Sequence, residues 1–514
     1  MNEKIVNVGV FWAIPDKVIG QSLLEVHKGY YTGEADINGF LNYPYSHFDV
    51  WEDEAQGLGD DCYKYPRGRV LYDVNLGKHK IFCDRHIDLQ IIDEVIMLFD
   101  IDDYEICYDE HYVCAACRRE KSSTKSKSNC VLKAEVLRGQ DKIGENLIRV
   151  TYGDVKILVE LGKQLERDEN AAQRETEFEN AILQEDFTAV VVSHYHEDHA
   201  GLISYKQNCP IYIGRGAYRV LKTSYEYLGK DFPKNLKTYS NNRPFKIGDI
   251  TVTPFLCDHS AYDSYMLLFE AGGQSILYTG DFRFHGRKDK DLLLSALPKS
   301  VDVLIHEGTN IGNDACHITE SQLEDRALEI MQATDGPIFV LSSASNVDRL
   351  VSIYRASKRS GRLTYMDNYM SLIASAAGGK IPRPDVFKDV IAFTPRPLDG
   401  RRKDMFFEIN NKRGAKSIAA HTQRFTMFVR PSMLPYLKKL FALAQYSDAT
   451  LIYSIWKGYK KDKEVSTFLD GVRSLGIKAQ DLHTSGHASE EDIQLLKSIV
   501  SAKQYVCVHT QNNN

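Results

Sequence analysis

The sequence has few cysteines, no long apolar run and little excess charge. Ten cysteines among 514 residues are too few for a disulfide-stabilised secreted scaffold, and they indicate a reduced, cytoplasmic protein. No apolar segment reaches the roughly 20 residues of a membrane-spanning helix, which argues against a membrane partner. The formal net charge of -6 excludes a globally basic surface, so contacts with a polyanion must come from local clusters.

The composition is that of a globular protein with several domains. Hydrophobic residues make up 43% of the chain and charged residues 26%, which excludes disorder of the chain as a whole. At about 100–200 residues per domain, the length of 514 residues predicts about two to four domains.

A basic, serine-rich segment without apolar side chains divides the sequence. We place a solvated linker at residues 118–130, with a basic arm that also contacts phosphates as the alternative. Residues 1–117 are expected to form a small α+β accessory module, because a hairpin is predicted from residues 69–72 and 80–83 and a helix over residues 87–98. Its role is open, and recruitment of a protein partner is one option.

Beyond the linker, apolar strands alternate with helical segments, which predicts an α/β architecture with helices packed outside sheets. A charged helix is expected over residues 165–183. The expected strands cover residues 146–152, 155–161, 187–193, 274–279, 301–305, 338–341 and 505–508.

Three histidines and an aspartate directly follow the apolar strand at residues 187–193. His194, His196, Asp198 and His199 fall on one strand-to-helix turn, so their side chains can converge on one point. Neutral imidazole and carboxylate oxygen are the ligands that Zn²⁺ or Mn²⁺ prefer. The spacing therefore predicts a metal site.

Further ligand candidates stand at the ends of later strands. His259, Asp281 and His509 each follow an apolar run. Loops at strand ends are held by a rigid sheet and commonly carry active-site residues. Taken singly, each of these residues is explained as well by a structural role, and their order and context make the set stronger.

This set resembles the metallo-β-lactamase superfamily, whose pattern is H-x-H-x-D-H followed by a His, an Asp and a last His. It is similar in particular to the β-CASP branch, which includes ribonuclease J and the mRNA 3′-end cleavage endonuclease. The branch marks are Glu307 at a strand end, His487 in the run 483–489, and His509. The resemblance begins at about residue 131 and does not include the N-terminal module.

The resemblance implies a metallo-β-lactamase αββα sandwich with an inserted β-CASP α/β cap. It places the first part of the metallo-β-lactamase-like domain at residues 131–312 and the cap at residues 313–475. Residues 476–514 would return to the first domain.

The resemblance also implies two divalent metal ions, zinc or manganese. One ion would bind His194, His196 and His259, and the other Asp198, His199 and His509, with Asp281 bridging the two. A metal-bound hydroxide would attack the phosphodiester, while His487 would act as the general acid and Glu307 would orient it. Asp198, His487 and Glu307 are the expected catalytic residues.

Substrate contacts are expected at the lips of the cap. Ser343, Ser345 and Asn346 stand at a strand-to-helix junction, where amide donors suit phosphate, and His483 and Ser485 would contact it from the other side. Basic clusters in the cap, such as the one at residues 457–463, would follow a polyanionic backbone, although each alone is also typical of a solvated face.

The leading interpretation is a two-metal-dependent nuclease whose partner is nucleic acid, with RNA favoured over DNA. One alternative is a hydrolase of a small phosphodiester or thioester, and another is a non-catalytic binding subunit. The expected cap, together with Glu307 and His487, favours the nuclease over the small-molecule hydrolase. The complete ligand set argues against a subunit without catalysis.

Overall fold

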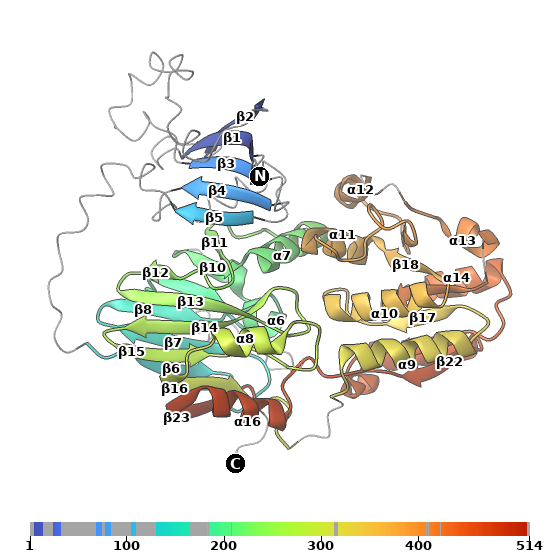
Figure 1. Ribbon diagram of the computed structural model, residues 1–514. Coiled ribbons are helices and arrows are strands. Elements are labelled where there is room, and N and C mark those ends of the chain that lie inside the picture. The colour runs from blue at the N-terminus through green and yellow to red at the C-terminus, as the bar shows by residue number, and fades with distance from the viewer. Residues whose placement is uncertain are drawn as a thin grey trace. The chain divides into compact units, whose positions relative to one another are not determined.

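The structure is a computed structural model of the chain (Figure 1). It describes residues 5–13, 24–31, 68–73, 78–83, 104–108, 130–164, 182, 184–206, 208–312, 317–407, 409, 411–421 and 423–510. Three of the expected segments lie outside the described residues. They are the helix at residues 87–98, the linker at residues 118–130 apart from its last residue, and nearly all of the helix at residues 165–183. Contacts divide the chain into two units, residues 1–129 and 130–514.

The N-terminal unit contains one sheet with the strand order β2-β1-β3-β4-β5. The predicted hairpin is confirmed, because β3 and β4 pair antiparallel from Gly68 opposite Cys83 to Asp73 opposite Lys78. The strands are β1 (Ile5–Ala13), β2 (Leu24–Tyr31), β3 (Gly68–Asp73), β4 (Lys78–Cys83) and β5 (Tyr104–Tyr108).

The second unit begins with two six-stranded sheets, which form the centre of a sandwich. The first has the order β11-β10-β9-β8-β7-β6, with β6 (Lys133–Arg138), β7 (Leu147–Tyr152), β8 (Val155–Val159), β9 (Ala189–Val192), β10 (Ile211–Gly214) and β11 (Leu236–Tyr239). The other has the order β12-β13-β14-β15-β16-β23, with β12 (Phe245–Ile247), β13 (Ile250–Cys257), β14 (Ser264–Ala271), β15 (Gln274–Tyr278), β16 (Ser300–Glu307) and β23 (Ser501–Val508).

The apolar strand β9 shows why the sheets are layered. Its side chains alternate between the two faces of the sheet, as strand geometry requires. Ala189 and Val191 pack in the core between the two sheets, whereas Val190 and Val192 pack in the core on the outer face. A strand that is buried on both faces has a continuous apolar sequence, which explains the uninterrupted run in the sequence.

Helices cover the outer faces of this sandwich. The outer core of the first sheet includes side chains of α7 (Arg215–Leu228). The outer core of the second sheet includes side chains of α8 (Lys290–Ala296) and α16 (Glu490–Ile499). The result is the αββα arrangement that the family resemblance implies.

A third, all-parallel sheet lies between β16 and β23 in sequence. Its order is β19-β18-β20-β17-β21-β22, with β17 (Ile338–Leu341), β18 (Leu363–Asp367), β19 (Val390–Phe393), β20 (Phe425–Val429), β21 (Thr450–Tyr453) and β22 (Lys478–Asp481). Helices pack on both faces, and we call this sheet with its helices the cap (Figure 1). Its helices are α9 (Glu320–Ala333), α10 (Val347–Arg359), α11 (Asn368–Ala377), α12 (Gly400–Phe407), α13 (Ala415–His421), α14 (Leu434–Leu443) and α15 (Lys463–Ser474).

The last strand of the cap sheet, β22, lies wholly after residue 475, the expected end of the cap, and pairs in parallel with β21.

Among the described residues, no helix is both long and apolar enough to cross a membrane.

Candidate metal centre and active site

The candidate ligands lie at the ends of strands in both sheets of the sandwich. His194 follows β9 of the first sheet, whereas His259 and Asp281 follow β13 and β15 of the second. Strands β15, β16 and β23 are parallel neighbours, so their carboxyl ends, including Glu307 and the residue after β23, His509, meet at one edge. A short helix, α6 (Glu197–Ala200), carries Asp198 and His199.

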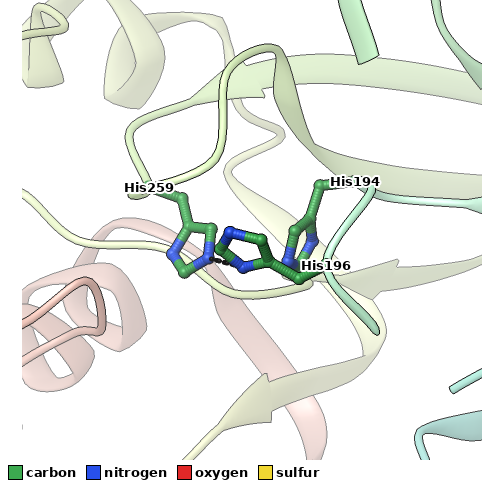
Figure 2. Close-up of side chains that lie close together, drawn as sticks. All are labelled: His194, His196 and His259. Carbon is green, nitrogen blue, oxygen red and sulfur yellow. Dashed lines mark hydrogen bonds between the residues drawn. The ribbon is translucent and has the colours of Figure 1, made fainter. Parts of the chain in front are cut away.

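Three histidines form the first cluster. Figure 2 shows the rings of His194, His196 and His259 turned toward one another. The rings of His194 and His259 are 4.7 Å apart between centroids, and His259 Nε2 lies 3.1 Å from His196 Nδ1. The candidate ligand atoms of the three residues all lie within 4.8 Å of one another. His259 Nδ1 donates a hydrogen bond of 2.6 Å to the Gly486 carbonyl oxygen, which leaves Nε2 available to a metal.

Asp281 joins this cluster to a second one, formed with Asp198, His199 and His509. Its Oδ2 lies 3.1 Å from His199 Nε2 and 3.8 Å from His259 Nε2. Its Oδ1 lies 3.6 Å from His509 Nδ1. The carboxylate therefore faces both groups, which is the position that a bridging ligand requires.

The donor set suits divalent transition metals. His194 Nε2 and both carboxylate oxygens of Asp281 are buried, and they make no hydrogen bond within the described part of the chain. Buried polar atoms without partners are rare in folded proteins, because desolvation without a hydrogen bond costs about 1–3 kcal/mol. Nitrogen and oxygen donors gathered in this way fit zinc or manganese, and they explain the unsatisfied atoms.

The protonation states favour metal binding. Burial, followed by the charges of neighbouring histidines, lowers the pKa of His194 and of His259 well below the usual range. Burial lowers the pKa of His196 to about 4. Burial also opposes ionisation of Asp281, but the charges of His199 and other histidines lower the pKa of this carboxyl well below its usual value. The three imidazoles of the first cluster and the Asp281 carboxylate are thus in the forms that bind a metal. Burial opposes the charge of His199, but Asp281, Asp198 and Glu160 raise its pKa well above the usual value, so a metal bound there would displace a proton.

His487 and Glu307 form an ion pair beside the second cluster. Glu307 Oε2 accepts a hydrogen bond of 3.0 Å from His487 Nδ1, which also lies 3.5 Å from Asp281 Oδ2. Burial alone would lower the pKa of His487, but the charges of Glu307 and Asp281 outweigh it and raise the pKa to about 9. The His487 side chain is 23% exposed, whereas that of Glu307 is 1% exposed. The imidazole is thus a charged, accessible proton donor at neutral pH.

Sequence reasoning gave no role to Thr309, which orients Glu307 and His509. Its hydroxyl donates to Glu307 Oε2 at 2.6 Å and therefore accepts from His509 Nδ1 at 2.7 Å. This arrangement leaves His509 Nε2 for a metal, 3.2 Å from Asp198 Oδ2. Thr309 lies two residues after Glu307, and no local signal distinguishes its hydroxyl from others in the chain.

Glu160 is a second orienting residue without a predicted role. It is fully buried, and both of its carboxylate oxygens accept hydrogen bonds of 3.2 Å from the Ser193 amide. Its Oε1 lies 3.3 Å from His199 Nδ1. The only signal in the sequence is an acidic residue directly after the apolar strand β8.

The predicted substrate residues fall at two loops beside the metal clusters. Tyr195, on the turn with the histidines, donates a hydrogen bond of 2.8 Å to the Ser345 carbonyl oxygen. Ser343 is exposed and lies within hydrogen-bonding distance of Ser345, at 2.8 Å between hydroxyl oxygens. Asn346, by contrast, accepts from the Arg349 amide and so caps α10.

On the other side, the Ser485 hydroxyl is buried and accepts hydrogen bonds from the Asn310 side chain and the His487 amide. This geometry gives Ser485 a role in shaping the His487 loop. Burial and the nearby charge of Arg349 lower the pKa of His483 to about 3, so this imidazole is neutral.

A buried charge network connects the cap to these loops. Arg283 donates to Asp258 at 2.7 Å and to Asp348 of α10 at 2.7 Å. Asp258 precedes the ligand His259, and Arg283 also donates to the Ser485 carbonyl oxygen at 2.9 Å. One guanidinium group thus fixes the cap, a metal-ligand loop and the His487 loop together.

Comparisons with known proteins agree with this geometry. Residues 168–342 match a family model described as a beta-lactamase superfamily domain. Ribonuclease J 1 of Streptococcus pyogenes is 22% identical over 387 residues, which cover 72% of this chain and 67% of the relative. Ribonuclease J of Synechocystis is 25% identical over 404 residues, 74% of this chain and 61% of the relative.

Ribonuclease J of Thermus thermophilus is 22% identical over 62% of this chain and 57% of its own length. The matched region therefore spans 57–67% of the length of these curated relatives.

The fold has a counterpart among solved structures. A crystal structure of a protein of unknown function from Enterococcus faecalis V583 is similar with a TM-score of 0.60 and 20% identity, over 74% of this chain and 94% of that chain. The strand-end clusters, the sandwich and the matched sequences agree with one another. Over residues 168–342 the chain matches the beta-lactamase superfamily domain, and over about three quarters of its length it is similar to ribonuclease J proteins of the β-CASP branch.

Proposed function

We propose that this protein is a two-metal-dependent nuclease that hydrolyses phosphodiester bonds in RNA. The observation that carries the proposal is the position of Asp281 between two metal-suited clusters, with the His487–Glu307 pair beside them. The relatives named ribonuclease J support RNA as the substrate class.

His194, His196 and His259 would hold one divalent cation, and Asp198, His199 and His509 the other, with Asp281 shared. When bound, such a pair of cations lowers the pKa of a water molecule to near neutrality and offsets the charge of the scissile phosphate. The rest of the site orients these ligands: Thr309 fixes His509, the Gly486 carbonyl oxygen fixes His259, and Glu160 contacts His199.

His487 would supply the proton that the leaving oxygen needs. Because Nδ1 donates to Glu307, the protonated ring holds its second proton at Nε2, where it is available to the substrate. Glu307 keeps this proton in place at neutral pH, since its charge raises the pKa of His487 to about 9 against the effect of burial.

The test is cleavage of 5′-labelled single-stranded RNA and DNA in the presence of Zn²⁺ or Mn²⁺. We expect RNA to be cut, chelation to abolish the cut, and mass spectrometry to find about two metal ions per chain, as in two-metal sites generally. Intact RNA and DNA together with turnover of a small phosphodiester or thioester would replace the proposal with a small-molecule hydrolase. A protein that binds RNA but takes up no metal would be a binding subunit.

A further inference from the structure

The loop after β21 presents an exposed tryptophan, Trp456, whose side chain no role above explains. Trp456 is 62% exposed, although it is one of only 3 tryptophans in the chain. A Cβ placed on Gly458 would lie 2.1 Å from Trp456 Cζ3, so the indole lies directly over this glycine. One face of the ring is therefore packed on backbone, and the exposure belongs to the remaining surface.

The loop holds this ring in a fixed orientation. The Trp456 carbonyl oxygen accepts hydrogen bonds from the Tyr453 hydroxyl at 3.0 Å and from the Tyr459 amide at 3.2 Å. The rings of Trp456 and Tyr459 meet edge to face at 90°, with centroids 5.4 Å apart. A large aromatic surface kept exposed and fixed is costly in water, and such surfaces mark binding sites.

The position of the loop connects it to the candidate active site. Leu341 and Tyr453 are paired residues of the parallel strands β17 and β21, and the Ser454 amide donates to the Leu341 carbonyl oxygen at 2.9 Å. The loop that follows β17 carries Ser345, whose carbonyl oxygen binds Tyr195 on the histidine turn. Trp456 therefore stands on the loop beside the one that contacts the histidine turn.

Electrostatics gives a second link to the metal clusters. Burial, and next the charge of Asp198, raise the pKa of Tyr459. Since Asp198 belongs to the second cluster, the Tyr459 hydroxyl is near enough to feel that charge. Tyr459, whose ring meets the indole edge to face, is therefore within electrostatic range of the second cluster.

The charges around the indole suit a polyanion. Lys457 and Lys461 are exposed and form no ion pair within the described part of the chain, whereas Lys460 pairs with Asp481 at 2.7 Å. Proteins that bind single-stranded nucleic acid combine such free cations with aromatic rings on which bases stack. A base inside a duplex is already stacked on its neighbours, so an aromatic ring of this kind would bind only unpaired bases.

We propose that Trp456 is the stacking platform for one nucleobase of single-stranded RNA that enters the metal centre, with Lys457 and Lys461 contacting its phosphates. This inference rests on the proposed nuclease function, and it adds to that function a binding site for one base of the RNA. The platform selects unpaired RNA and contributes to binding, but not to the chemical step.

The test is the affinity of the full-length protein for a labelled decauridylate, with chelator present so that no cleavage occurs. Because stacking contributes about 1–3 kcal/mol per base, Trp456→Ala should weaken binding by roughly 5- to 150-fold. Trp456→Phe should keep most of the affinity, and it should also remove the quenching of tryptophan fluorescence that the RNA causes. A duplex of the same length should bind wild type and Trp456→Ala alike.

Phe407→Ala is the matched control. Phe407 is 75% exposed and is the last residue of α12. Its neighbour Phe406 packs on Ala392 of β19. Strand β19 is one edge of the cap sheet, and β21 and β22 lie at the other edge. This variant should bind RNA as the wild type does. Gly458→Ala, which displaces the indole but keeps it in the chain, should weaken binding as Trp456→Ala does.

Hydrolysis of bis(p-nitrophenyl) phosphate separates this inference from the proposed function. Its rate should be unchanged in Trp456→Ala, which also shows that the variant is folded. Equal RNA affinity of wild type and Trp456→Ala would overturn the platform and leave the nuclease intact. Failure of the wild type both to bind and to cut RNA would overturn both proposals.

Discussion

His487 illustrates how one residue depends on partners from distant parts of the chain. Its Nδ1 contacts Glu307, 180 positions earlier in the sequence, and lies 3.5 Å from Asp281. In water an imidazole would be about half protonated near pH 6.5, and burial would lower its pKa further. The two carboxylates reverse that effect and raise the pKa of His487 to about 9, so the imidazole is cationic at neutral pH, as the proposed general acid must be.

Replacement of His487 by alanine should therefore slow RNA cleavage without removing the metals. Loss of a general acid typically costs about 10²–10⁴-fold in rate, and we expect a fall in kcat of this size. The measurement is single-turnover cleavage, combined with metal content by mass spectrometry. His421→Ala, an exposed histidine on α13, should behave as wild type. Loss of metal from His487→Ala would instead make this residue a ligand.

The residues of the site differ in how far the sequence could predict them. The turn from His194 to His199 is informative because ligands within one turn are brought together by local geometry. Thr309 and Glu160 carry no such signal: a hydroxyl and a carboxylate acquire their partners only when distant strands meet. Motif reasoning therefore finds the candidate ligands, while most of the groups that orient them require coordinates.

Among the elements, helix α9 shows how buried charge joins the cap to the sandwich. Its first residue, Glu320, is fully buried and accepts from Arg349 of α10 at 3.2 Å and from Arg283 at 3.3 Å. Burial opposes ionisation of Glu320, but the two guanidinium groups lower its pKa to about 2. The Glu320 carboxylate thus offsets part of the positive charge of the two buried guanidinium groups, those of Arg349 and Arg283.

Glu320→Gln should lower the free energy of unfolding by about 3–5 kcal/mol near pH 7, as expected when one partner of a buried ion pair is removed. The pKa in the folded state is lower than the ordinary value of 4.5, so the stabilisation is complete above about pH 4.5 and is lost as the pH falls toward 2. Urea midpoints measured from pH 7 to pH 3 should therefore converge for wild type and variant.

The control for this prediction is Glu329→Gln on the same helix, where the side chain is exposed. An exposed substitution should change stability by less than about 0.5 kcal/mol at every pH. If Glu320→Gln keeps a constant deficit down to pH 3, the loss comes from packing and not from the ionised carboxylate.

Two strands of the cap sheet show the contrast between a strand that its own sequence indicates and one that it does not. β17 was predicted with its observed bounds because all four of its residues are buried and apolar. β22 was not predicted: Lys478, Ala479, Gln480 and Asp481 are all exposed, and only pairing with β21 makes them a strand. At an edge strand, the neighbouring backbone decides the structure, and the side-chain pattern gives no indication of it.

For residues 130–514 as a whole, the candidate metal centre connects the two sheets of the sandwich. The first sheet presents His194 after β9, and the second presents Asp281 after β15 and His509 after β23. Two cations held by these clusters, with Asp281 shared, would link strand ends that the interior of the sandwich already keeps close. Because they bind the folded state and not the unfolded chain, they should stabilise the fold by mass action.

Zinc at 100 times its dissociation constant should thus add about 2.7 kcal/mol to the free energy of unfolding. For a unit of this size, we expect the thermal midpoint of the wild type to rise by about 2–4 °C or more over the chelated protein, measured by differential scanning calorimetry. Asp281→Asn should abolish this rise, because the residue shared by both clusters loses its charge. Asp302→Asn, which removes the charge that pairs with Lys503 and leaves an oxygen to accept from the Ser275 amide, should retain it. An equal rise in both variants would mean that zinc binds elsewhere on the chain, and that the two sheets are joined by packing alone.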